Sequence, residues 1–293
     1  MEAALTVLQI VTPVFLLAAI GFVWVKAGFA YDIQFVTRLA MSLAVPALVF
    51  SALTRTEVSP GALSIVTLAA IAAYGAIALA AWLAVRLQGL EIRTYLAPMI
   101  FGNTGNVGLP LALFAYGQEG LGYAVVIFAV SAVLVFTLGI WLVSGGASPL
   151  RVLREPMVLA TLAGAVFLWR GWKLPEVLDN SVSLLGQMAI PLMLITLGVA
   201  VARLKPERVG RTVWLSLLRS VLTIAIAAGV AAGFGLPPVA TGVLILQMSA
   251  PVAVTSYLLA ERYRADSGAV ASLVVTSTLL AIGTIPLTLA FLL

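Results

Sequence analysis

Cysteine and histidine are both absent from the 293 residues of this chain. Their absence excludes disulfides, thiolate and imidazole metal sites, cysteine nucleophiles, histidine proton relays and Ser-His dyads. Charge is also scarce, at 9% of residues, whereas a soluble domain carries about a quarter. Together with a hydrophobic content of 62% and a mean hydropathy of +1.16, this composition indicates a protein of the lipid bilayer.

Acidic residues are missing from the middle of every long apolar run. The eleven that the chain contains all fall in predicted loops or at the ends of predicted spans: Glu2, Asp32, Glu57, Glu91, Glu119, Glu155, Glu176, Asp179, Glu207, Glu261 and Asp266. Cation transporters and proton pumps usually keep a carboxylate at mid-membrane, so an anionic or neutral substrate fits better. Because no histidine, cysteine or buried acid can activate a serine or a water molecule, we expect no enzyme, no metal site and no cofactor.

Apolar runs of about 20 residues recur along the whole chain, and each is long enough to cross about 30 Å of hydrocarbon. We predict an all-α membrane protein with ten spans, centred near residues 15, 44, 73, 106, 132, 163, 191, 223, 249 and 280. The first run, Ala4–Val25, lacks a basic leader and an A-x-A site. We therefore expect it to be the first span and not a cleaved signal.

Basic residues divide unequally between the two sets of predicted loops. One set contains Lys26, Arg38, Arg86, Arg93, Arg151, Arg154, Arg203, Lys205, Arg208, Arg211, Arg262 and Arg264, and the other contains Arg55, Arg170 and Lys173. Lysine and arginine are retained on the cytoplasmic side, so this division predicts an inner-membrane protein with both termini outside. The sequence pI near 9.8 does not indicate nucleic acid as a partner, because the basic residues are scattered through short loops.

The chain also contains an internal repeat. The stretch "MSLAVPALVFSAL" (Met41–Leu53) aligns with "GQMAIPLMLITLG" (Gly186–Gly198), which pairs Pro46 with Pro191. At nearly the same offset "FGNTGNVGLPLALFAYG" falls on "QMSAPVAVTSYLLAERY". We predict two five-span halves, 1–150 and 151–293, of which the second is inverted. Inverted repeats with interrupted helices are typical of secondary transporters whose site lies between the repeats. Taken singly, Pro46 and Pro191 indicate helix kinks.

The candidate site begins at "FGNTGNVGLP", which places poor helix formers in mid-span. We expect the helix to break over 103–108 and to restart near Pro110, with its positive N-terminal end toward an anion. The predicted polar contacts are Asn103, Thr104 and Asn106 in the first half, Gln247, Ser249, Thr255 and Ser256 around Pro251 in the second half, and Gln187 as a weaker candidate. The glycines Gly102, Gly105 and Gly108 either permit the helix to unwind or serve close helix packing.

Arg219 is the only charged residue that we place within a predicted span. Two interpretations stay open for its side chain. The guanidinium reaches back to the membrane interface, or it contacts an anionic substrate on the inward path.

The stretches "PALVFSAL", "GNTGNVGLPLALFAYG" and "APVAVTSYLLAERYRAD" resemble the auxin efflux carrier family of secondary transporters, and the resemblance extends over nearly the whole chain. The family is related to the sodium–bile acid symporters. The resemblance implies that the fourth and ninth helices are interrupted and cross at the substrate site. It also implies a scaffold of spans 1, 2, 6 and 7 and a mobile transport domain of spans 3–5 and 8–10. Asn103 and Pro110 match the family's N-T-x-x-x-G-x-P motif, and Pro251 matches its ninth-span proline, whereas Thr255 and Ser256 depart from its pattern.

The function expected from these features is efflux of a small organic anion, such as a mono- or dicarboxylate, by alternating access. Bacterial relatives are associated with malonate-like carboxylates and plant relatives with the auxin anion. Two alternatives stay open: a sodium-coupled organic anion symporter of the bile acid symporter type, and an anion channel. The partners expected are the organic anion and the lipid bilayer. Coupling to Na⁺ or H⁺ and assembly into a homodimer are left open by the sequence.

Overall fold

The computed structural model of the chain describes residues 2–55, 58–145, 156–204 and 209–292. Throughout these ranges the backbone is helical, with short connections and no β-strand, so the prediction of an all-α membrane protein is confirmed. The elements are α1 (Glu2–Lys26), α2 (Ile33–Leu39), η1 (Ala40–Ala44), α3 (Val45–Arg55), α4 (Pro60–Leu87), α5 (Ile92–Ile100), η2 (Thr104–Gly108), α6 (Leu109–Leu134), η3 (Val135–Gly139), α7 (Ile140–Ser144), α8 (Pro156–Arg170), α9 (Glu176–Gln187), α10 (Ala189–Arg203), α11 (Val209–Gly233), α12 (Pro238–Ser249), α13 (Val254–Arg262) and α14 (Ser267–Leu292).

Among the described residues, seven helical segments are long and apolar enough to cross a membrane. They are Leu5–Lys26, Ile33–Arg55, Pro60–Leu87, Thr104–Ser144, Glu176–Arg203, Val209–Phe234 and Ser267–Leu292. Two further apolar helices, Val158–Arg170 and Pro238–Ser249, are shorter. Many large apolar side chains lie exposed on these helices, as expected where the solvent is lipid. The chain is therefore a multi-pass membrane protein.

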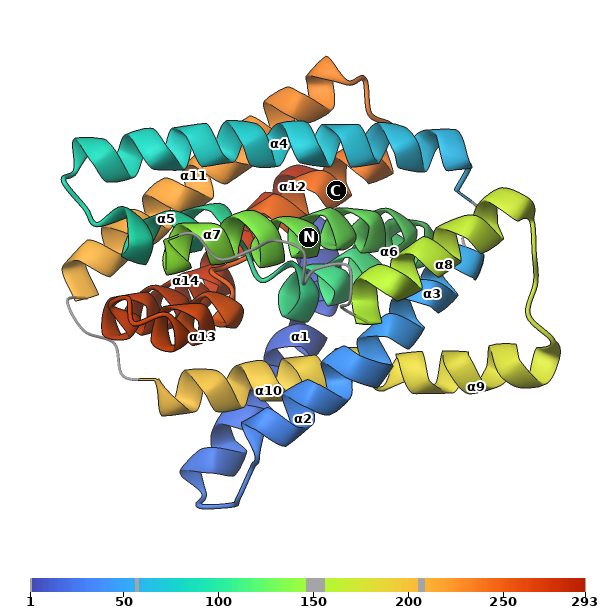
Figure 1. Ribbon diagram of the computed structural model, residues 1–293, viewed down its shortest axis with the longest axis horizontal. Coiled ribbons are helices and arrows are strands. Elements are labelled where there is room, and N and C mark those ends of the chain that lie inside the picture. The colour runs from blue at the N-terminus through green and yellow to red at the C-terminus, as the bar shows by residue number, and fades with distance from the viewer. Residues whose placement is uncertain (1, 56–57, 146–155, 205–208, 293) are drawn as a thin grey trace.

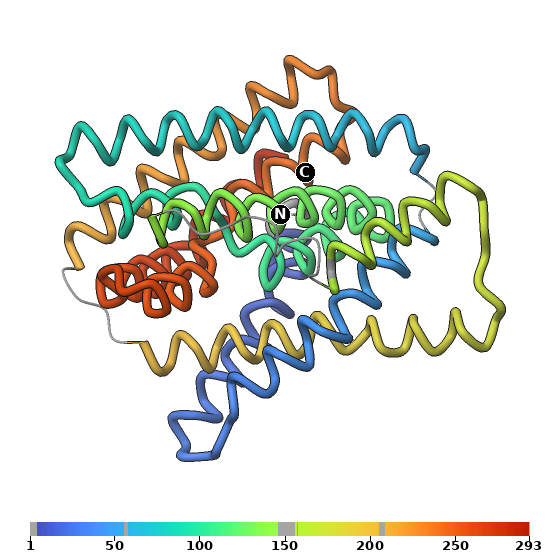
Figure 2. Tube along the Cα trace, in the orientation of Figure 1, coloured from blue at the N-terminus to red at the C-terminus, as the bar shows by residue number. Residues whose placement is uncertain are grey.

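The helices form two groups that face each other. In Figure 1, α4 and α11 lie along one edge of the molecule, and α10 lies with α2 and α3 along the opposite edge. On the second edge α1 packs across α10, and α3 packs against α8 and α9 (Figure 2). On the first edge α11 packs against α4, α12 and α14. Two non-helical connections lie between the groups. One joins α5 to η2 and α6, and the other joins α12 to α13.

Glycines bring α1 and α10 into direct backbone contact. A Cβ added at Gly21 of α1 would overlap the carbonyl of Ile195, and one added at Gly198 of α10 would overlap the carbonyl of Ala18. Small residues at such positions let membrane helices approach closely enough for van der Waals packing to hold them. This contact fixes α1 on α10 as one unit.

Two prolines within helices each follow a π-helical turn. The turn η1 ends two residues before Pro46, and η2 ends two residues before Pro110. Proline lacks an N–H and its ring collides with the carbonyl four residues earlier, and the wider π turn accommodates both effects. At Pro191 the irregularity takes another form, because α9 ends at Gln187 and α10 begins at Ala189.

Candidate functional site

The two interrupted helices meet at their breaks. Helix α5 ends at Ile100 and the chain is helical again from Thr104, while α12 ends at Ser249 and α13 begins at Val254. Between these ends Gly102 and Val252 form an antiparallel bridge. The N–H of Asn103 donates to the carbonyl of Pro251 at 2.6 Å, and the N–H of Ala253 donates to the carbonyl of Phe101 at 3.4 Å. The two extended segments therefore cross in backbone contact.

Two more backbone groups at this crossing have side-chain partners. The N–H of Val252 donates to Oγ of Ser277, on α14, at 2.9 Å. The carbonyl of Ala250 accepts a hydrogen bond from Nη1 of Arg219, on α11, at 2.7 Å. Irregular backbone at membrane depth is tolerated only where such groups find partners inside the protein. Ser277 and Arg219 thus complete the hydrogen bonding that the interrupted helices lack.

Asn103 begins the second half of the first broken helix as its N-cap. Its Oδ1 accepts a hydrogen bond from the N–H of Asn106 at 3.3 Å, and this contact fixes the orientation of the side-chain amide. The other amide atom, Nδ2, is a donor by elimination and has no hydrogen-bond partner among the described residues, although the side chain is only 6% exposed. A buried donor without a partner is costly, so this atom is a candidate partner for an acceptor on a ligand.

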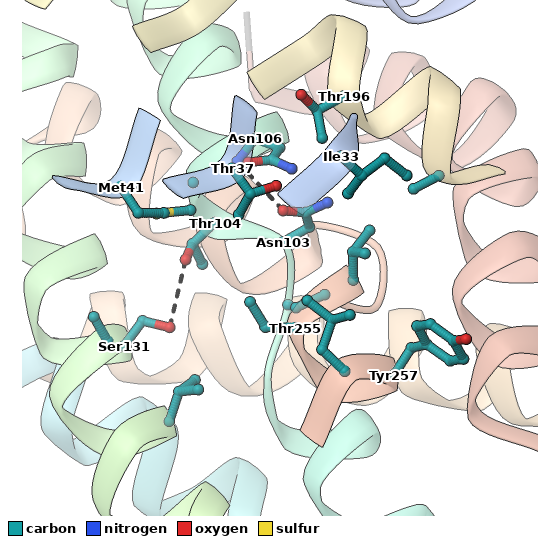
Figure 3. A pocket seen from close by; sticks show the side chains of 18 of the residues that line it. Ile33, Thr37, Met41, Asn103, Thr104, Asn106, Ser131, Thr196, Thr255 and Tyr257 are labelled. Carbon is teal, nitrogen blue, oxygen red and sulfur yellow. Dashed lines mark hydrogen bonds between the residues drawn. The ribbon is translucent and has the colours of Figure 1, made fainter. Parts of the chain in front are cut away.

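A cavity of about 280 Å³ lies directly beside this amide. Figure 3 shows Asn103 and Asn106 side by side at its wall, with Thr104 turned toward Ser131 (Oγ1 to Oγ, 3.4 Å). Its lining residues are Ile33, Thr37, Met41, Gly102, Asn103, Thr104, Gly105, Asn106, Phe128, Ser131, Ala132, Val135, Phe136, Thr196, Ala200, Arg203, Leu204, Ala253, Val254, Thr255, Tyr257 and Leu258. The first residues of η2 and of α13 are both in this wall, so two positive helix ends face the cavity.

Among the described residues, the charge of the cavity wall is positive. Arg203 is the one charged residue in that part of the lining, which includes no aspartate or glutamate. Its guanidinium is exposed, and Nη2 donates to the carbonyl of Tyr31 at 2.6 Å. The Tyr31 hydroxyl in turn lies 2.7 Å from Oγ1 of Thr196. These contacts tie the end of α10 to the connection before α2 at this cavity.

A second cavity, of about 430 Å³, lies toward the opposite ends of the same helices. Its lining residues are Leu48, Ser51, Ala52, Arg55, Leu113, Gln118, Leu121, Ser183, Gly186, Gln187, Ile190 and Pro191. Arg55 forms an ion pair with Asp179 at 2.7 Å and donates to Ser183 at 3.0 Å. Gln187, a weaker candidate for the substrate site from the sequence, lines this second cavity instead, and so does Pro191, which the sequence predicts as a helix kink.

The break in the first helix lies earlier and is shorter than the sequence predicts. Helical structure resumes at Thr104, six residues before Pro110 (104 to 110), because Asn103 caps it there and the π turn accommodates the proline. Of the three glycines only Gly102 lies in the extended segment. Gly105 packs against Phe128 and Met193, and Gly108 packs against Gln247, so these two serve close packing.

The two breaks pair in a different register from the sequence alignment, and the second half therefore presents fewer polar groups to the first cavity than expected. The bridge pairs Gly102 with Val252, and both N-caps, Asn103 and Ala253, are 150 residues apart (103 to 253). The sequence alignment used an offset of 146 and pairs Asn103 with Ser249. Ala253 has no side-chain cap.

Of the candidates around Pro251, only Thr255 lines the cavity. Gln247, Ser249 and Ser256 are buried outside it. Nε2 of Gln247 donates to the carbonyl of Ala124 at 3.4 Å. Pro251 itself lies in the break and contributes its carbonyl to the crossing, as the partner of the Asn103 N–H.

Arg219 lies at neither of the two positions considered from the sequence. Its side chain is 2% exposed, so it does not reach the membrane interface, and it is not among the residues that line either cavity described above. The guanidinium lies against the crossing segments instead.

Sequence reasoning missed two further residues. Ser277 stands in the polar run Thr276–Thr278 inside an apolar span, and that run was a usable signal. Arg203 was counted only toward the orientation of the loops, and nothing in the sequence places it at the cavity.

Comparison with known proteins agrees with the resemblance noted from the sequence. The profile of a family described as membrane transport protein matches residues 6–152 and again residues 140–289. An uncharacterized transporter of Methanothermobacter thermautotrophicus is 28% identical over 305 aligned positions, covering 98% of this chain and 96% of that protein. An uncharacterized transporter of Methanocaldococcus jannaschii is 24% identical over 192 positions, which cover 61% of each chain. The chain therefore belongs to the membrane transport protein family of the auxin efflux carriers.

Proposed function

We propose that this protein is a secondary transporter that exports a small organic anion by alternating access at the crossing of its two broken helices. The observation that carries the proposal is the buried Nδ2 of Asn103, a donor without a partner among the described residues. It adjoins a cavity whose wall, in the part of the chain that the structure describes, contains two helix N-termini, one arginine and no carboxylate. Such a wall favours an acceptor with negative charge.

The rest of the cavity wall bears on the shape of the substrate. Most of the lining is apolar, including Phe128, Val135 and Phe136. A volume of about 280 Å³ lies just below the range for pockets that hold drug-sized ligands. We infer a small carboxylate whose head group accepts from Asn103 and whose apolar body lies against the aromatic side chains. This chemistry covers monocarboxylates well and short dicarboxylates less well.

The architecture supports the predicted ten spans in two inverted halves. The long segment Thr104–Ser144 contains Gly117 at φ 62° and ψ −150°, a break that allows it to serve as the end of one span and the whole of the next. Helices α1, α2, α3, α8, α9 and α10 pack on one another, which supports the scaffold that the family resemblance implies. The remaining helices, which include both crossing segments, would form the moving transport domain.

The two cavities support alternating access, because equivalent positions of the repeats line opposite cavities. At the offset of 145 residues, Ser51 corresponds to Thr196 and Arg55 to Ala200. Ser51 and Arg55 line the second cavity, whereas Thr196 and Ala200 line the first. In the orientation that the loop charges predict, the first cavity opens to the cytoplasm and the second to the outside. Export of an anion would then be driven by the inside-negative potential, which contributes about 2.3 kcal/mol per charge per 100 mV.

A flux assay in proteoliposomes with an imposed potential tests this function. Purified protein should catalyse potential-driven flux and counterflow exchange of at least one radiolabelled carboxylate in a series that varies chain length and apolar body. Flux restricted to cations, or single-channel currents without counterflow, would contradict the proposal.

Substituting Asn103→Asp distinguishes two roles of this side chain, capping the helix and donating a hydrogen bond to the substrate. Aspartate caps a helix as well as asparagine, and the positive N-terminal end of η2 compensates its charge, so the melting temperature should stay close to that of the wild type. Its carboxylate replaces the donor with a negative charge, and anion flux should fall roughly 10- to 100-fold, since hydrogen bonds to charged groups contribute about 1.5–3 kcal/mol. Gln34→Glu is the matched control, an amide-to-acid change on an exposed residue of α2. Equal flux in both variants would remove Asn103 from the substrate site.

A further inference from the structure

Arg219 is a buried charge without a carboxylate partner among the described residues. The ion pair found in those residues joins Arg55 to Asp179, both lining or adjoining the second cavity. The Nε and Nη2 atoms of Arg219 have no hydrogen-bond partner there either, and only Nη1 is paired, with the carbonyl of Ala250. A buried charge is very unfavourable unless its surroundings compensate it. Within the described part of the chain, no carboxylate supplies the compensation for Arg219.

The guanidinium lies against both crossing segments. A Cβ added at Gly102 would lie 2.8 Å from Nη2 of Arg219 and 2.9 Å from the carbonyl oxygen of Ala250. Gly102 belongs to the first break and Ala250 to the second, so the arginine touches the point where they meet. Any larger residue at Gly102 would push the guanidinium away from the crossing.

The helix ends at this point carry the compensating charge. Helices α5 and α12 both end at the crossing, at Ile100 and Ser249, and neither end residue lines the cavity. Each helix C-terminus is equivalent to about −0.5 of an elementary charge, so the two ends together amount to about −1. One guanidinium offsets that charge. The opposite, positive ends of η2 and α13 face the cavity and stay available to an anion.

We propose that Arg219 is a positioning residue that acts as a tethered cation, bonded to the carbonyl end of α12 and packed on Gly102 of the first break, in the place where a mobile coupling cation would otherwise be needed. Helix α11 packs on α12, so the arginine moves with the crossing when the transport domain moves. A mobile ion would leave the site in each cycle, whereas the side chain compensates the helix ends in every state. Substrate binding at the crossing then needs no sodium ion.

Stability measurements test the charge directly and do not depend on any substrate. Arg219→Met and Arg219→Lys have similar length but differ in charge, and Arg211→Gln is an exposed control on the same helix. We expect Arg219→Met to melt roughly 10 °C below the wild type, and Arg219→Lys and the control to melt well above Arg219→Met. Low-millimolar guanidinium chloride should raise the melting temperature of Arg219→Ala, while the same concentration of urea should not.

Two results would overturn the inference: Arg219→Lys melting as low as Arg219→Met, or Arg219→Ala insensitive to guanidinium. Either would make Arg219 a packing residue. A second arm, which rests on the proposed function, compares wild-type anion flux in sodium and in choline buffers. Equal flux is expected, and flux that requires sodium would also overturn the inference. Absence of any anion flux would contradict the proposed function alone, since the melting experiments judge the arginine independently.

Discussion

At the scale of single residues, the crossing depends on side chains that form hydrogen bonds with backbone groups. In a continuous helix those groups would have bonded to each other. Ser277 accepts from the N–H of Val252, and Arg219 donates to the carbonyl of Ala250. Asn103 both caps a helix and carries, beside the cavity, a buried donor without a partner among the described residues. Their importance comes from the lipid surroundings, where a stranded backbone group has no water to bind.

Replacing Ser277 by alanine tests the first of these contacts. The Val252 N–H would lose its partner while buried, and we expect a loss of about 1–3 kcal/mol in the free energy of unfolding. Thr278→Val is the matched control, because Oγ1 of Thr278 donates to the carbonyl of Val274 within its own helix. Thermal denaturation in detergent measures both. Losses of equal size would show that the crossing does not need the Ser277 hydroxyl.

At the scale of helices, the packing of α1 on α10 and the irregular turns before the prolines set the frame around the crossing. The π turns η1 and η2 let Pro46 and Pro110 remain within spans that continue on both sides. Glycines let α1 and α10 approach until their backbones touch. The π turns accommodate prolines, which lack a backbone N–H, and the α1–α10 contact requires glycines, which lack a Cβ.

The α1–α10 contact predicts opposite effects for two glycine substitutions. In Gly198→Ala the new methyl group would overlap the carbonyl of Ala18, and we expect a loss of about 1–3 kcal/mol from overpacking. In Gly229→Ala nothing lies within 4 Å of the new Cβ, so the higher helix propensity of alanine should stabilise α11 by up to about 1 kcal/mol. Melting temperatures of the two purified variants, compared with the wild type, distinguish these effects. Equal shifts would contradict the close contact.

At the scale of the whole molecule, the distribution of basic residues predicts which cavity faces the cytoplasm. Arg203 lines the first cavity and belongs to the basic-rich set of loops, whereas Arg55 lines the second and belongs to the other set. The first cavity therefore opens inward if the loop charges set the orientation. Export of an anion then begins at the cavity that contains Asn103.

Cysteine labelling tests that orientation, because the chain contains no native cysteine to label. Ala30→Cys lies exposed in the connection between α1 and α2, and Asn180→Cys lies exposed on α9. A membrane-impermeant maleimide added to intact spheroplasts should label the cysteine at 180, and should label the one at 30 only after permeabilisation. The reverse pattern would show the opposite orientation in the membrane, in which the first cavity faces outward.

The sequence by itself predicted much of the site in the first half and less in the second. The N-T-x-x-x-G-x-P stretch identified Asn103, Thr104 and Asn106, all of which line the cavity, because poor helix formers in mid-span are visible locally. Around Pro251 the alignment was four residues away from the pairing in the crossing (150 against 146), so Gln247, Ser249 and Ser256 were placed at the cavity although they lie elsewhere. Helix propensity locates a break approximately, but the hydrogen bonds across the crossing decide its register.

Composition and pattern alone determined that the chain is an all-helical membrane protein, and they located a polar interruption near Asn103 within an apolar run. These properties follow from transfer free energies and helix propensities that each residue carries with it. Only the tertiary structure decided that the two breaks pair with each other, that the helix restarts at Thr104, and that Arg219 lies against the crossing. Those outcomes depend on contacts between residues more than a hundred positions apart, and no local property of the sequence specifies which partners meet.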